Sequence, residues 1–525
     1  MCWPERDIFK TARQRLALAV SNKQKKIMEH TYCINIFKAL LIMLLSISRL
    51  YAQDSPFPDK SELEGKNSGD FVIKSGTIYK NKADFGLILV PESRSNPQSR
   101  PITIPFIRHY ARNDSIEKPI FLLGGGPGKS NLWTEMPEVF YTHNDVINVG
   151  YRGVDGDIKL KCKGIGEAMT INNPLSPASL ITMRKTLRGT YDSLLQESID
   201  LNGYNMLEVV DDIEAVRNAL GYEDFNLFST SYGTQVAYIA CLRYPQYIHR
   251  NLMIGASNRE RLLLGWEPEM VDKMLNNYNT LWKSDSEAVL KSPDILITIK
   301  KVFQTLPIEW QNIRIDPDKL KLASFYLLYE TETAAALFDA YVAAEKGDYS
   351  GLALISLGYD ETVIDTSRQY WGDFINKVVS GGLDTTKSYD SEPTGSIFGS
   401  PSRKFWWNST SLGGWPVNQI PTEFRQLDTI KAKTLIINGE LDFSSPPDYI
   451  MELNPYLSNG KIVIIPSMGH MEVVYNQREG FEHLVDKFYR NGIVDTSKYI
   501  PKKIDFTPAE TFQDEAKRLF QNEIK

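Results

Sequence analysis

Leu227-Phe228-Ser229-Thr230-Ser231-Tyr232-Gly233-Thr234 is the stretch that decides the fold of this chain. The apolar run at its start predicts a buried strand, and the apolar spacing after Gly233 predicts a buried helix. A serine in a tight turn between strand and helix is the context of a nucleophile elbow, whose strained backbone pushes the hydroxyl of Ser231 outward. Strand and helix nearly touch there, so the positions two before and two after the serine must be small. Gly233 meets this demand, whereas Ser229 stands where the motif G-x-S-x-G has glycine.

The composition of the 525 residues is that of a globular protein, with 42% hydrophobic and 24% charged residues. The formal net charge is −6. The first 53 residues hold nine basic and three acidic side chains, so the remainder carries a net charge of −12. An acidic body argues against nucleic acid as a partner. The cysteines and histidines show no zinc-type spacing, so we expect no metal and no cofactor.

Residues 1–53 are expected to be a leader rather than part of the fold. Residues 39–45 form an apolar segment of signal-peptide length, well short of the ~20 residues that a membrane span needs. We therefore expect a signal peptide, export to the periplasm or the medium, and no stable membrane insertion after cleavage. Met28 is an alternative start, and an N-terminal membrane anchor is the competing interpretation. Cys162 and Cys241 remain after cleavage, either as one disulfide or as two buried thiols.

Strand and helix patterns alternate along the first part of the chain, which predicts a mostly parallel sheet flanked by helices. The expected strands are 71–79, 84–90, 102–109, 119–123, 145–149, 225–228 and 248–255, with a helix at 206–220. Helical patterns and aromatic clusters then replace the alternation, until strands at 434–438 and 461–466 and a helix at 479–489 resume it. The expected divisions are a leader (1–53), the first part of the core (54–258), an inserted helical cap (259–414) and the C-terminal part of the core (415–525).

Three of the expected strand ends carry the residue types of a nucleophilic triad: Ser231, Asp442 and His470. Parallel sheets place their ligand sites at the carboxyl ends of strands. A histidine can take the proton of a serine hydroxyl and return it to the leaving group, and a buried carboxylate fixes the tautomer of that histidine. Other candidates remain open at two positions. The rivals are Glu440 and Asp448 for the acid and His483 for the base.

A glycine-rich loop, Gly124-Gly125-Gly126-Pro127-Gly128-Lys129-Ser130, follows the strand expected at 119–123. It lacks the spacing G-x-x-x-x-G-K-[ST] of a phosphate-binding loop. Glycines allow backbone N–H groups to approach a reacting carbonyl closely, and proline stiffens the turn. The loop is therefore expected to contribute to an oxyanion hole.

These motifs together resemble the α/β-hydrolase serine peptidases of the proline iminopeptidase and tripeptidyl aminopeptidase type. Residues 211–221, followed by the elbow, resemble the helix-plus-elbow block of that family. The loop Gly125–Gly128 matches the family's H-G-G-P-G motif, with Gly124 in place of the histidine, and residues 439–442 match its acid loop. Gly414-Trp415-Pro416 resembles the entry to the C-terminal part of the tripeptidyl-type members.

The resemblance implies an α/β-hydrolase fold with an inserted, largely helical cap domain. It also implies that Ser231 forms an acyl-enzyme, that His470 acts as base and then acid, and that Asp442 orients His470. The backbone N–H groups of Tyr232 and Gly126, with Gly125 as second choice, would form the oxyanion hole. The implied substrates are peptides with a free N-terminus, from which single residues or short peptides are removed.

Substrate identity stays open on sequence grounds. A carboxylesterase or other acyl hydrolase acting on small esters with the same triad is the alternative, and a binding protein without activity is a third. An aminopeptidase of this family must hold a free ammonium group, usually with carboxylates of the cap. Glu330, Glu332 and Glu345 lie on or beside expected helices of the insertion and are candidates for that contact.

Overall fold

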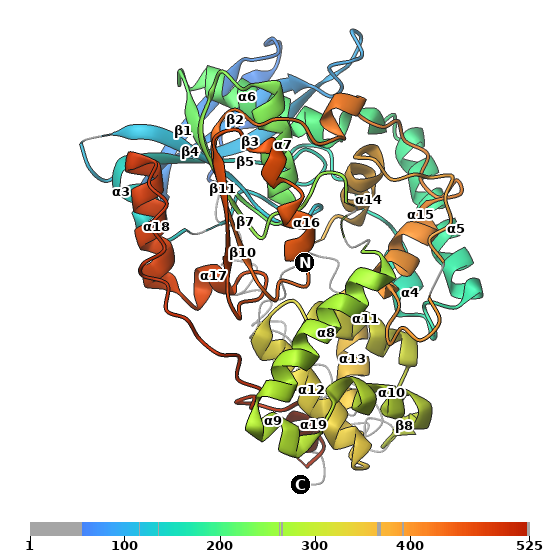
Figure 1. Cartoon of the computed structure of the whole chain (residues 1–525). Helices are drawn as coiled ribbons and strands as arrows, with labels where there is room; N and C mark the ends of the chain where they lie inside the picture. Colours follow the sequence, from blue (N-terminus) through green and yellow to red (C-terminus); the bar gives the residue numbers. More distant parts are fainter. Residues whose placement is uncertain are drawn as a thin grey trace, which may run out of the picture.

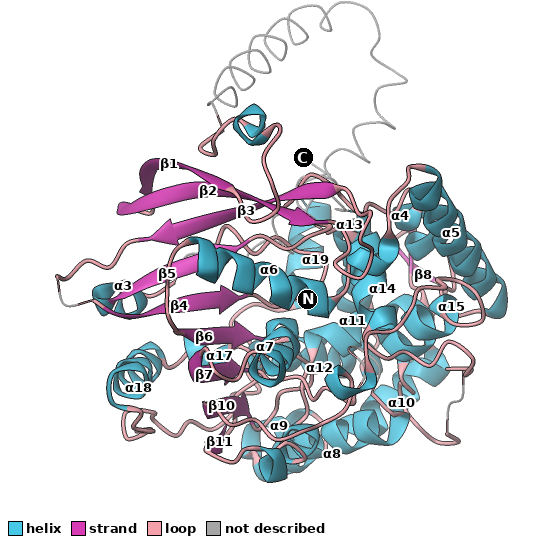
Figure 2. Ribbon diagram, turned by 90° about the horizontal axis from the view of Figure 1, so that it is seen from above, coloured by secondary structure: helices cyan, strands magenta, loops and turns pink. Residues whose placement is uncertain are grey.

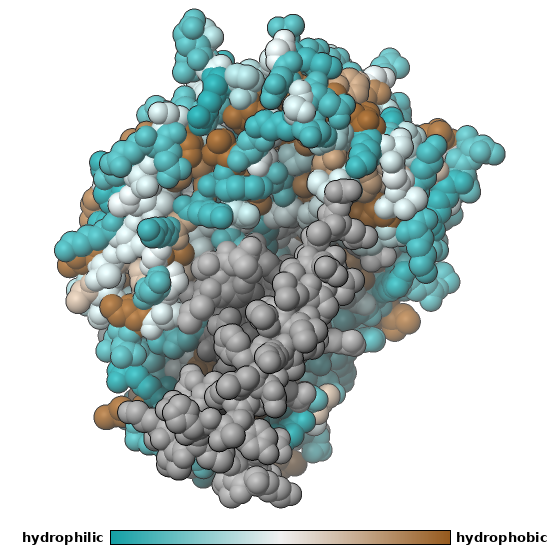
Figure 3. Space-filling model, turned by 180° about the vertical axis from the view of Figure 1, so that it is seen from behind, coloured by the Kyte–Doolittle hydropathy of each residue, from teal (hydrophilic) through white to brown (hydrophobic). Residues whose placement is uncertain are grey.

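The structure is a computed structural model that describes residues 55–114, 116–134, 136–261, 263, 266–364, 369–390 and 393–521. The leader expected at 1–53 lies outside these residues, so its role stays a prediction. Within the described ranges, no helix is long and apolar enough to cross a membrane. On the face seen from behind, the described hydrophobic residues form small patches among hydrophilic ones (Figure 3).

A central sheet of nine strands organises the described chain, in the order β1-β2-β3-β5-β4-β6-β7-β10-β11 (Figure 2). Neighbours are antiparallel from β1 to β5 across β2 and β3, and parallel from β5 to β11. The mostly parallel sheet that the sequence predicts is therefore confirmed. The strands are β1 (Phe71–Ile78), β2 (Asn81–Pro91), β3 (Pro101–His109), β4 (Glu117–Leu123), β5 (Asn144–Val149), β6 (Phe225–Thr230), β7 (Ile248–Ile254), β10 (Lys433–Gly439) and β11 (Gly460–Ile465).

Helices cover both faces of the sheet, which explains why β6 is buried along most of its length. One face packs against α6 (Met206–Ala219) and α7 (Tyr232–Arg243). The opposite face packs against α3 (Val139–His143), α17 (Glu472–Tyr475) and α18 (Arg478–Asn491). The sheet is thus the middle of three layers.

A helical insertion separates β7 from β10 in the chain, as the aromatic and helical patterns predict (Figure 1). Its short β8 (Glu309–Trp310) and β9 (Ile313–Arg314) form a separate hairpin. The division at 259 and 414, and the role of the insertion as a cap, stay predictions. The helical elements are α8 (Pro268–Ser284), α9 (Ser286–Lys291), α10 (Ile295–Thr305), α11 (Pro317–Leu327), α12 (Thr331–Glu345), α13 (Ser350–Ile364), α14 (Trp371–Ser380), the π-helical turn η4 (Arg403–Trp407) and α15 (Asn408–Thr410).

Three segments that the sequence presents as polar connections contain helices. The stretch between β5 and α6 holds α4 (Ile165–Thr170) and α5 (Pro177–Gln196), and the C-terminal tail holds α19 (Phe512–Gln521). Both α4 and α19 pack against α13, and α5 packs against α15. The expected linker at 54–68 contains the turn η1 (Lys60–Leu63). Polar residues outnumber apolar ones in these segments, so their narrow apolar stripes give a weak periodic signal.

The two cysteines of the described chain are free thiols, and both are buried. Of the two alternatives that the sequence leaves open, the structure therefore has the thiol pair rather than the disulfide. Burial raises the pKa of Cys162 to about 11 and that of Cys241 further still. Neither thiol is suited to act as a nucleophile near neutral pH, because the thiolate is the reactive form.

Candidate active site

Ser231 occupies a strained turn between β6 and α7. Its φ of 50° and ψ of −122° lie outside the regions that non-glycine residues normally adopt. A Cβ at Gly233 would overlap the carbonyl oxygen of Leu123 on β4, which confirms that this position must be glycine. Ser229 is fully buried, and its hydroxyl donates to the carbonyl of Leu252 at 3.4 Å. The serine thus fits the close approach that usually requires glycine.

His470 and Asp442 form a buried pair at the carboxyl end of the sheet. Nδ1 of His470 lies 3.0 and 2.9 Å from the two carboxylate oxygens of Asp442. That carboxylate also accepts the backbone N–H of Ser445 at 2.7 Å, the hydroxyl of Ser445 at 3.0 Å and the side-chain amide of Asn438 at 3.1 Å. These three donors fix the orientation of Asp442, and Asp442 in turn fixes the imidazole.

Ser231 and His470 border the same short turn after β7. The backbone N–H of Ser231 donates to the carbonyl of Ile254 at 2.9 Å, and a Cβ at Gly255 would lie 2.7 Å from Cε1 of His470. Nε2 of His470 is buried and has no hydrogen-bond partner among the described residues. The bond between Nε2 and the serine hydroxyl is thus not formed here, as is common in unliganded active sites.

The glycine-rich loop after β4 packs directly against the serine. A Cβ at Gly125 would lie 2.7 Å from Cβ of Ser231, and the backbone N–H of Gly125 donates to the hydroxyl of Thr230 at 3.1 Å. Gly126 has a φ of +80°. In the described part of the chain, the N–H groups of Gly126 and Tyr232 donate to no other residue. The geometry therefore favours Gly126 over Gly125 as the loop donor.

The rival candidates are engaged elsewhere. Glu440 is exposed and accepts the backbone N–H of Ser467 at 3.0 Å. Asp448 pairs with Lys273 at 2.5 Å, and His483 pairs with Asp495 at 2.8 Å. None of the three contacts the pair formed by His470 and Asp442.

Glu472 is a supporting residue for which the sequence pattern gives no signal. Its buried carboxylate accepts the backbone N–H of Gly469 at 2.6 Å and both the N–H and hydroxyl of Thr331, at 2.9 and 2.7 Å. Burial raises its pKa. The N–H of His470 also donates to the carbonyl of Tyr329 at 2.7 Å. The turn that carries His470 is therefore tied to the start of α12.

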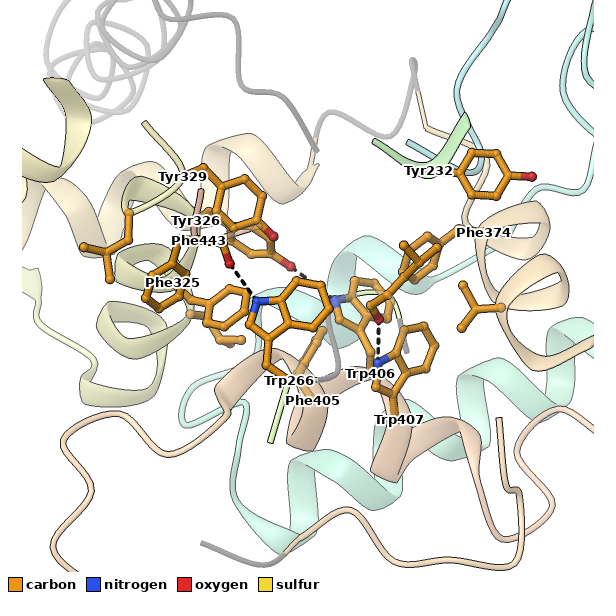
Figure 4. Packing of buried hydrophobic residues seen from close by; sticks show 14 of the residues in the cluster. Tyr232, Trp266, Phe325, Tyr326, Tyr329, Phe374, Phe405, Trp406, Trp407 and Phe443 are labelled. Atoms are coloured by element: carbon orange, nitrogen blue, oxygen red, sulfur yellow. Dashed lines mark hydrogen bonds between the residues drawn. The ribbon is translucent and has the colours of Figure 1, made fainter. Parts of the chain in front are cut away.

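Aromatic side chains of the insertion back the site, in an array between Tyr329 and Tyr232 (Figure 4). The ring of Tyr329 lies edge-on to the imidazole of His470, with centroids 5.8 Å apart. Trp266 donates from Nε1 to the carbonyl of Phe443 at 2.7 Å, next to Asp442. The ring of Tyr232 is buried against Tyr151, and burial raises the pKa of its phenol well above the usual value.

A cleft of about 1230 Å³ lies beside the glycine-rich loop and the turn after His470, and Ser231, Asp442 and His470 are not among its lining residues. Its wall includes Lys129 and Ser130, which follow the glycine-rich loop, and Met471, which follows His470. The other side chains on it are both aromatic and charged. They include Phe57, Trp133, Tyr370, Tyr475, Lys159, Asp155, Asp157 and Glu330.

The arrangement is suited to nucleophilic acyl transfer. It combines a serine hydroxyl on a strained turn, an imidazole held by a carboxylate, and two backbone N–H groups near that serine that have no acceptor among the described residues. Within the described residues, no group of three or more His, Cys, Asp or Glu side chains could hold a metal ion.

Two family models match the chain. Residues 118–291 match the model described as alpha/beta hydrolase fold, and residues 402–499 match the model described as TAP-like protein. The chain therefore has the α/β-hydrolase fold. The two matches also support a hydrolase activity.

Several solved structures of hydrolases are similar to the chain at low identity and low TM-score. One is an alpha/beta hydrolase enzyme from a Medee basin deep-sea metagenome library, with 14% identity over 80% of this chain and 99% of that chain, at a TM-score of 0.35. Another is the meta-cleavage product hydrolase CumD from Pseudomonas fluorescens IP01, with 14% identity over 75% and 96%, at 0.37. A thermophilic esterase from Thermogutta terrifontis has 13% identity over 77% and 98%, at 0.32. The chain matches no curated protein.

Proposed function

We propose that this protein is an exported serine aminopeptidase, which removes N-terminal residues or short peptides through an acyl-enzyme. The observation that carries the proposal is the buried pair of His470 and Asp442 at the sheet edge where Ser231 stands on its strained turn. The family match described as TAP-like protein supports the peptidase class.

In the proposed reaction, Ser231 attacks the scissile carbonyl while His470 accepts the hydroxyl proton at Nε2. The backbone N–H groups of Gly126 and Tyr232 stabilise the oxyanion, an element typically worth about 3 kcal/mol per donor. His470 then protonates the departing amine, and water hydrolyses the acyl-enzyme by the same route in reverse. Asp442 holds the tautomer of His470 that this sequence of steps requires.

Glu330 is the carboxylate that we assign to the substrate ammonium. It lies on the wall of the cleft, and its carboxylate accepts the backbone N–H of Met471, the neighbour of His470, at 3.1 Å. The other two candidates are placed less well. Glu345 bonds to Thr298 at 2.6 Å and Lys301 at 3.0 Å, while Glu332 is exposed in the first turn of α12.

The basic test of the proposal uses aminoacyl and peptidyl anilides with Ser231→Ala as the control. Turnover is expected in the unaltered protein and is expected to vanish in Ser231→Ala. Acetylation of the substrate N-terminus is expected to reduce turnover strongly, since it removes the ammonium charge. Unchanged turnover of acetylated peptides would refute the exopeptidase assignment, and ester turnover far above any peptide turnover would favour an esterase.

Glu330→Gln tests the ammonium contact separately from the fold. The amide oxygen of glutamine can still accept the N–H of Met471, whereas the negative charge is lost. We expect KM for free peptides to rise at least tenfold, with little change for acetylated esters. Glu345→Gln, at the opposite end of α12, is the matched control, and an equal effect there would refute the assignment of Glu330.

Export belongs to the proposal because the apolar segment at 39–45 has the length of a signal peptide. The mass of the mature N-terminus in the source cells tests it. A start near residue 54 is expected, and a retained apolar segment would instead indicate the membrane anchor.

A further inference from the structure

The glycine-rich loop beside Ser231 is held from the insertion by the start of α14. The backbone N–H of Gly128 donates to the carboxylate of Asp373 at 3.0 Å, and the N–H of Tyr370 donates to the carbonyl of Gly128 at 2.7 Å. The side-chain amide of Gln369 donates to the carbonyl of Pro127 at 2.8 Å. Three hydrogen bonds from the five residues 369–373 therefore hold the end of the loop in place.

Asp373 is fully buried, and its charged partner lies on its own helix. Lys377 pairs with it at 2.8 Å, and neither side chain has any exposed surface. Burial raises the pKa of Asp373 to about 6, against the opposing effect of the Lys377 charge. Its second oxygen, Oδ1, has no hydrogen-bond partner among the described residues. A buried pair of this kind contributes little stability relative to apolar side chains, so stability alone gives no reason for it.

The same pair reaches the other end of the loop through Tyr151. Nζ of Lys377 lies 5.1 Å from the centroid of the Tyr151 ring and donates to the carbonyl of Arg152 at 3.2 Å. The hydroxyl of Tyr151 donates to the carbonyl of Gly124 at 3.1 Å. Both ends of the Gly124–Gly128 loop are thus fixed by groups that contact the pair, with Gly126 between them.

We propose that Asp373, supported by Lys377, is a positioning residue that holds the glycine-rich loop so that the N–H of Gly126 faces the oxyanion. This inference rests on the proposed acyl-transfer function. Asp373 acts through Gly128 and does not itself touch the reacting atoms. Its loss should therefore lower kcat rather than weaken substrate binding, because the oxyanion donor acts mainly in the transition state.

The test compares two double variants that both remove the buried charges. In Asp373→Leu/Lys377→Met, no acceptor remains for the N–H of Gly128, and we expect kcat on peptide anilides to fall about 10- to 100-fold with KM changed less than threefold. In Asp373→Asn/Lys377→Met, the amide oxygen can still accept that N–H, and most of the lost kcat should return. The affinity of a peptide aldehyde, which forms an oxyanion on Ser231, should fall in parallel with kcat.

Removal of a different buried ion pair tests whether a loss of kcat comes from the position of the loop or from a general loss of stability. Lys319 on α11 pairs with Asp360 on α13 at 2.7 Å, and Lys319 is almost fully buried. Lys319→Met/Asp360→Leu should lower Tm by a similar amount or more while kcat stays within twofold. Equal loss of kcat in this control, or equal kcat in the two Asp373 variants, would overturn the positioning role.

Failure of this inference can be told from failure of the proposed function. If Ser231→Ala abolishes turnover while the Asp373→Leu double variant keeps kcat, only the positioning role is wrong. If Ser231→Ala keeps turnover, the proposed acyl-enzyme on Ser231 is refuted, whatever the Asp373 variants show.

Discussion

The acid loop and the glycine-rich loop both follow the carboxyl ends of parallel strands, but different parts of the chain hold them in place. Besides the imidazole of His470, the donors to the Asp442 carboxylate are Asn438 and Ser445, which lie within four residues of it. Around Gly128, they come from Gln369, Tyr370 and Asp373, and the bond to Asp373 spans 245 residues. The carboxylate of Asp442 is thus oriented mainly by its own loop, whereas the glycine-rich loop depends on the docking of the insertion. Substitutions in the insertion should therefore displace the N–H donors of the oxyanion hole more than they change the orientation of Asp442.

Among changes in the two loops, the largest effect on activity is expected from Asp442→Asn. An amide at this position no longer holds the imidazole in the required tautomer, and such a change typically lowers kcat by about 10⁴-fold. Steady-state turnover of a peptide anilide measures it, with Tm to establish that the variant is folded. A fall of less than about tenfold in a folded variant would show that another carboxylate serves as the acid.

Gly128→Ala tests the loop that depends on the insertion. The φ of +81° at this position is strained for alanine, and the new Cβ would lie 2.5 Å from the carbonyl oxygen of Tyr370 and overlap Nε2 of Gln369. The loop or the start of α14 must shift, so we expect kcat to fall about 100-fold and the free energy of unfolding to fall by about 1–3 kcal/mol.

Gly347→Ala is the matched control for this substitution. Gly347 also has a positive φ, +96°, but a Cβ there meets nothing within 4 Å. Gly347→Ala should therefore lower the free energy of unfolding about as much as Gly128→Ala does, and leave kcat unchanged. An equal fall of kcat in both variants would show that backbone strain, rather than the contact with α14, causes the effect.

The same contrast explains which parts of the molecule the sequence could predict. The parallel strands β6 and β10 are buried on both faces and the edge strand β11 is half-buried, so their apolar runs are clear, and the candidate residues Ser231, Asp442 and His470 follow from the ends of these three strands. Asp373 and Lys377 give no such signal. An aspartate four residues before a lysine on a helix is typical of a solvent-exposed pair, and only the packing of α14 shows that this pair is buried. Glu472 was missed for the same reason, since its partner Thr331 lies 141 residues away.

Ser445→Ala is expected to have a smaller effect within the acid loop. It removes the hydroxyl that donates to Asp442 at 3.0 Å but keeps the backbone N–H at 2.7 Å and the amide of Asn438. A hydrogen bond to a charged group is worth about 1.5–3 kcal/mol, of which the remaining donors recover a part, so kcat should fall about tenfold. A loss as large as that of Asp442→Asn would show that the local contacts act as one unit, and no loss would make the hydroxyl redundant.

His109 provides the smallest effect on activity, because it lies on β3 and belongs to neither loop. Its imidazole is buried between the rings of Tyr79 and Tyr141, and burial lowers its pKa to about 4. Because the unfolded chain binds the proton more tightly, the neutral imidazole favours the folded state above about pH 6.5. This contribution is lost as the pH falls to about 4, which amounts to about 3 kcal/mol.

His109→Phe should remove this pH dependence, since phenylalanine does not titrate. Urea unfolding at pH 7 and pH 4 measures it: the wild type should lose about 3 kcal/mol more than the variant over this interval. The kcat of the variant at pH 7 should stay within twofold of the wild type, in contrast to changes in either loop. Equal pH dependence in both proteins would mean that folding does not lower the pKa of His109. If phenylalanine proves too large to fit, His109→Leu repeats the comparison.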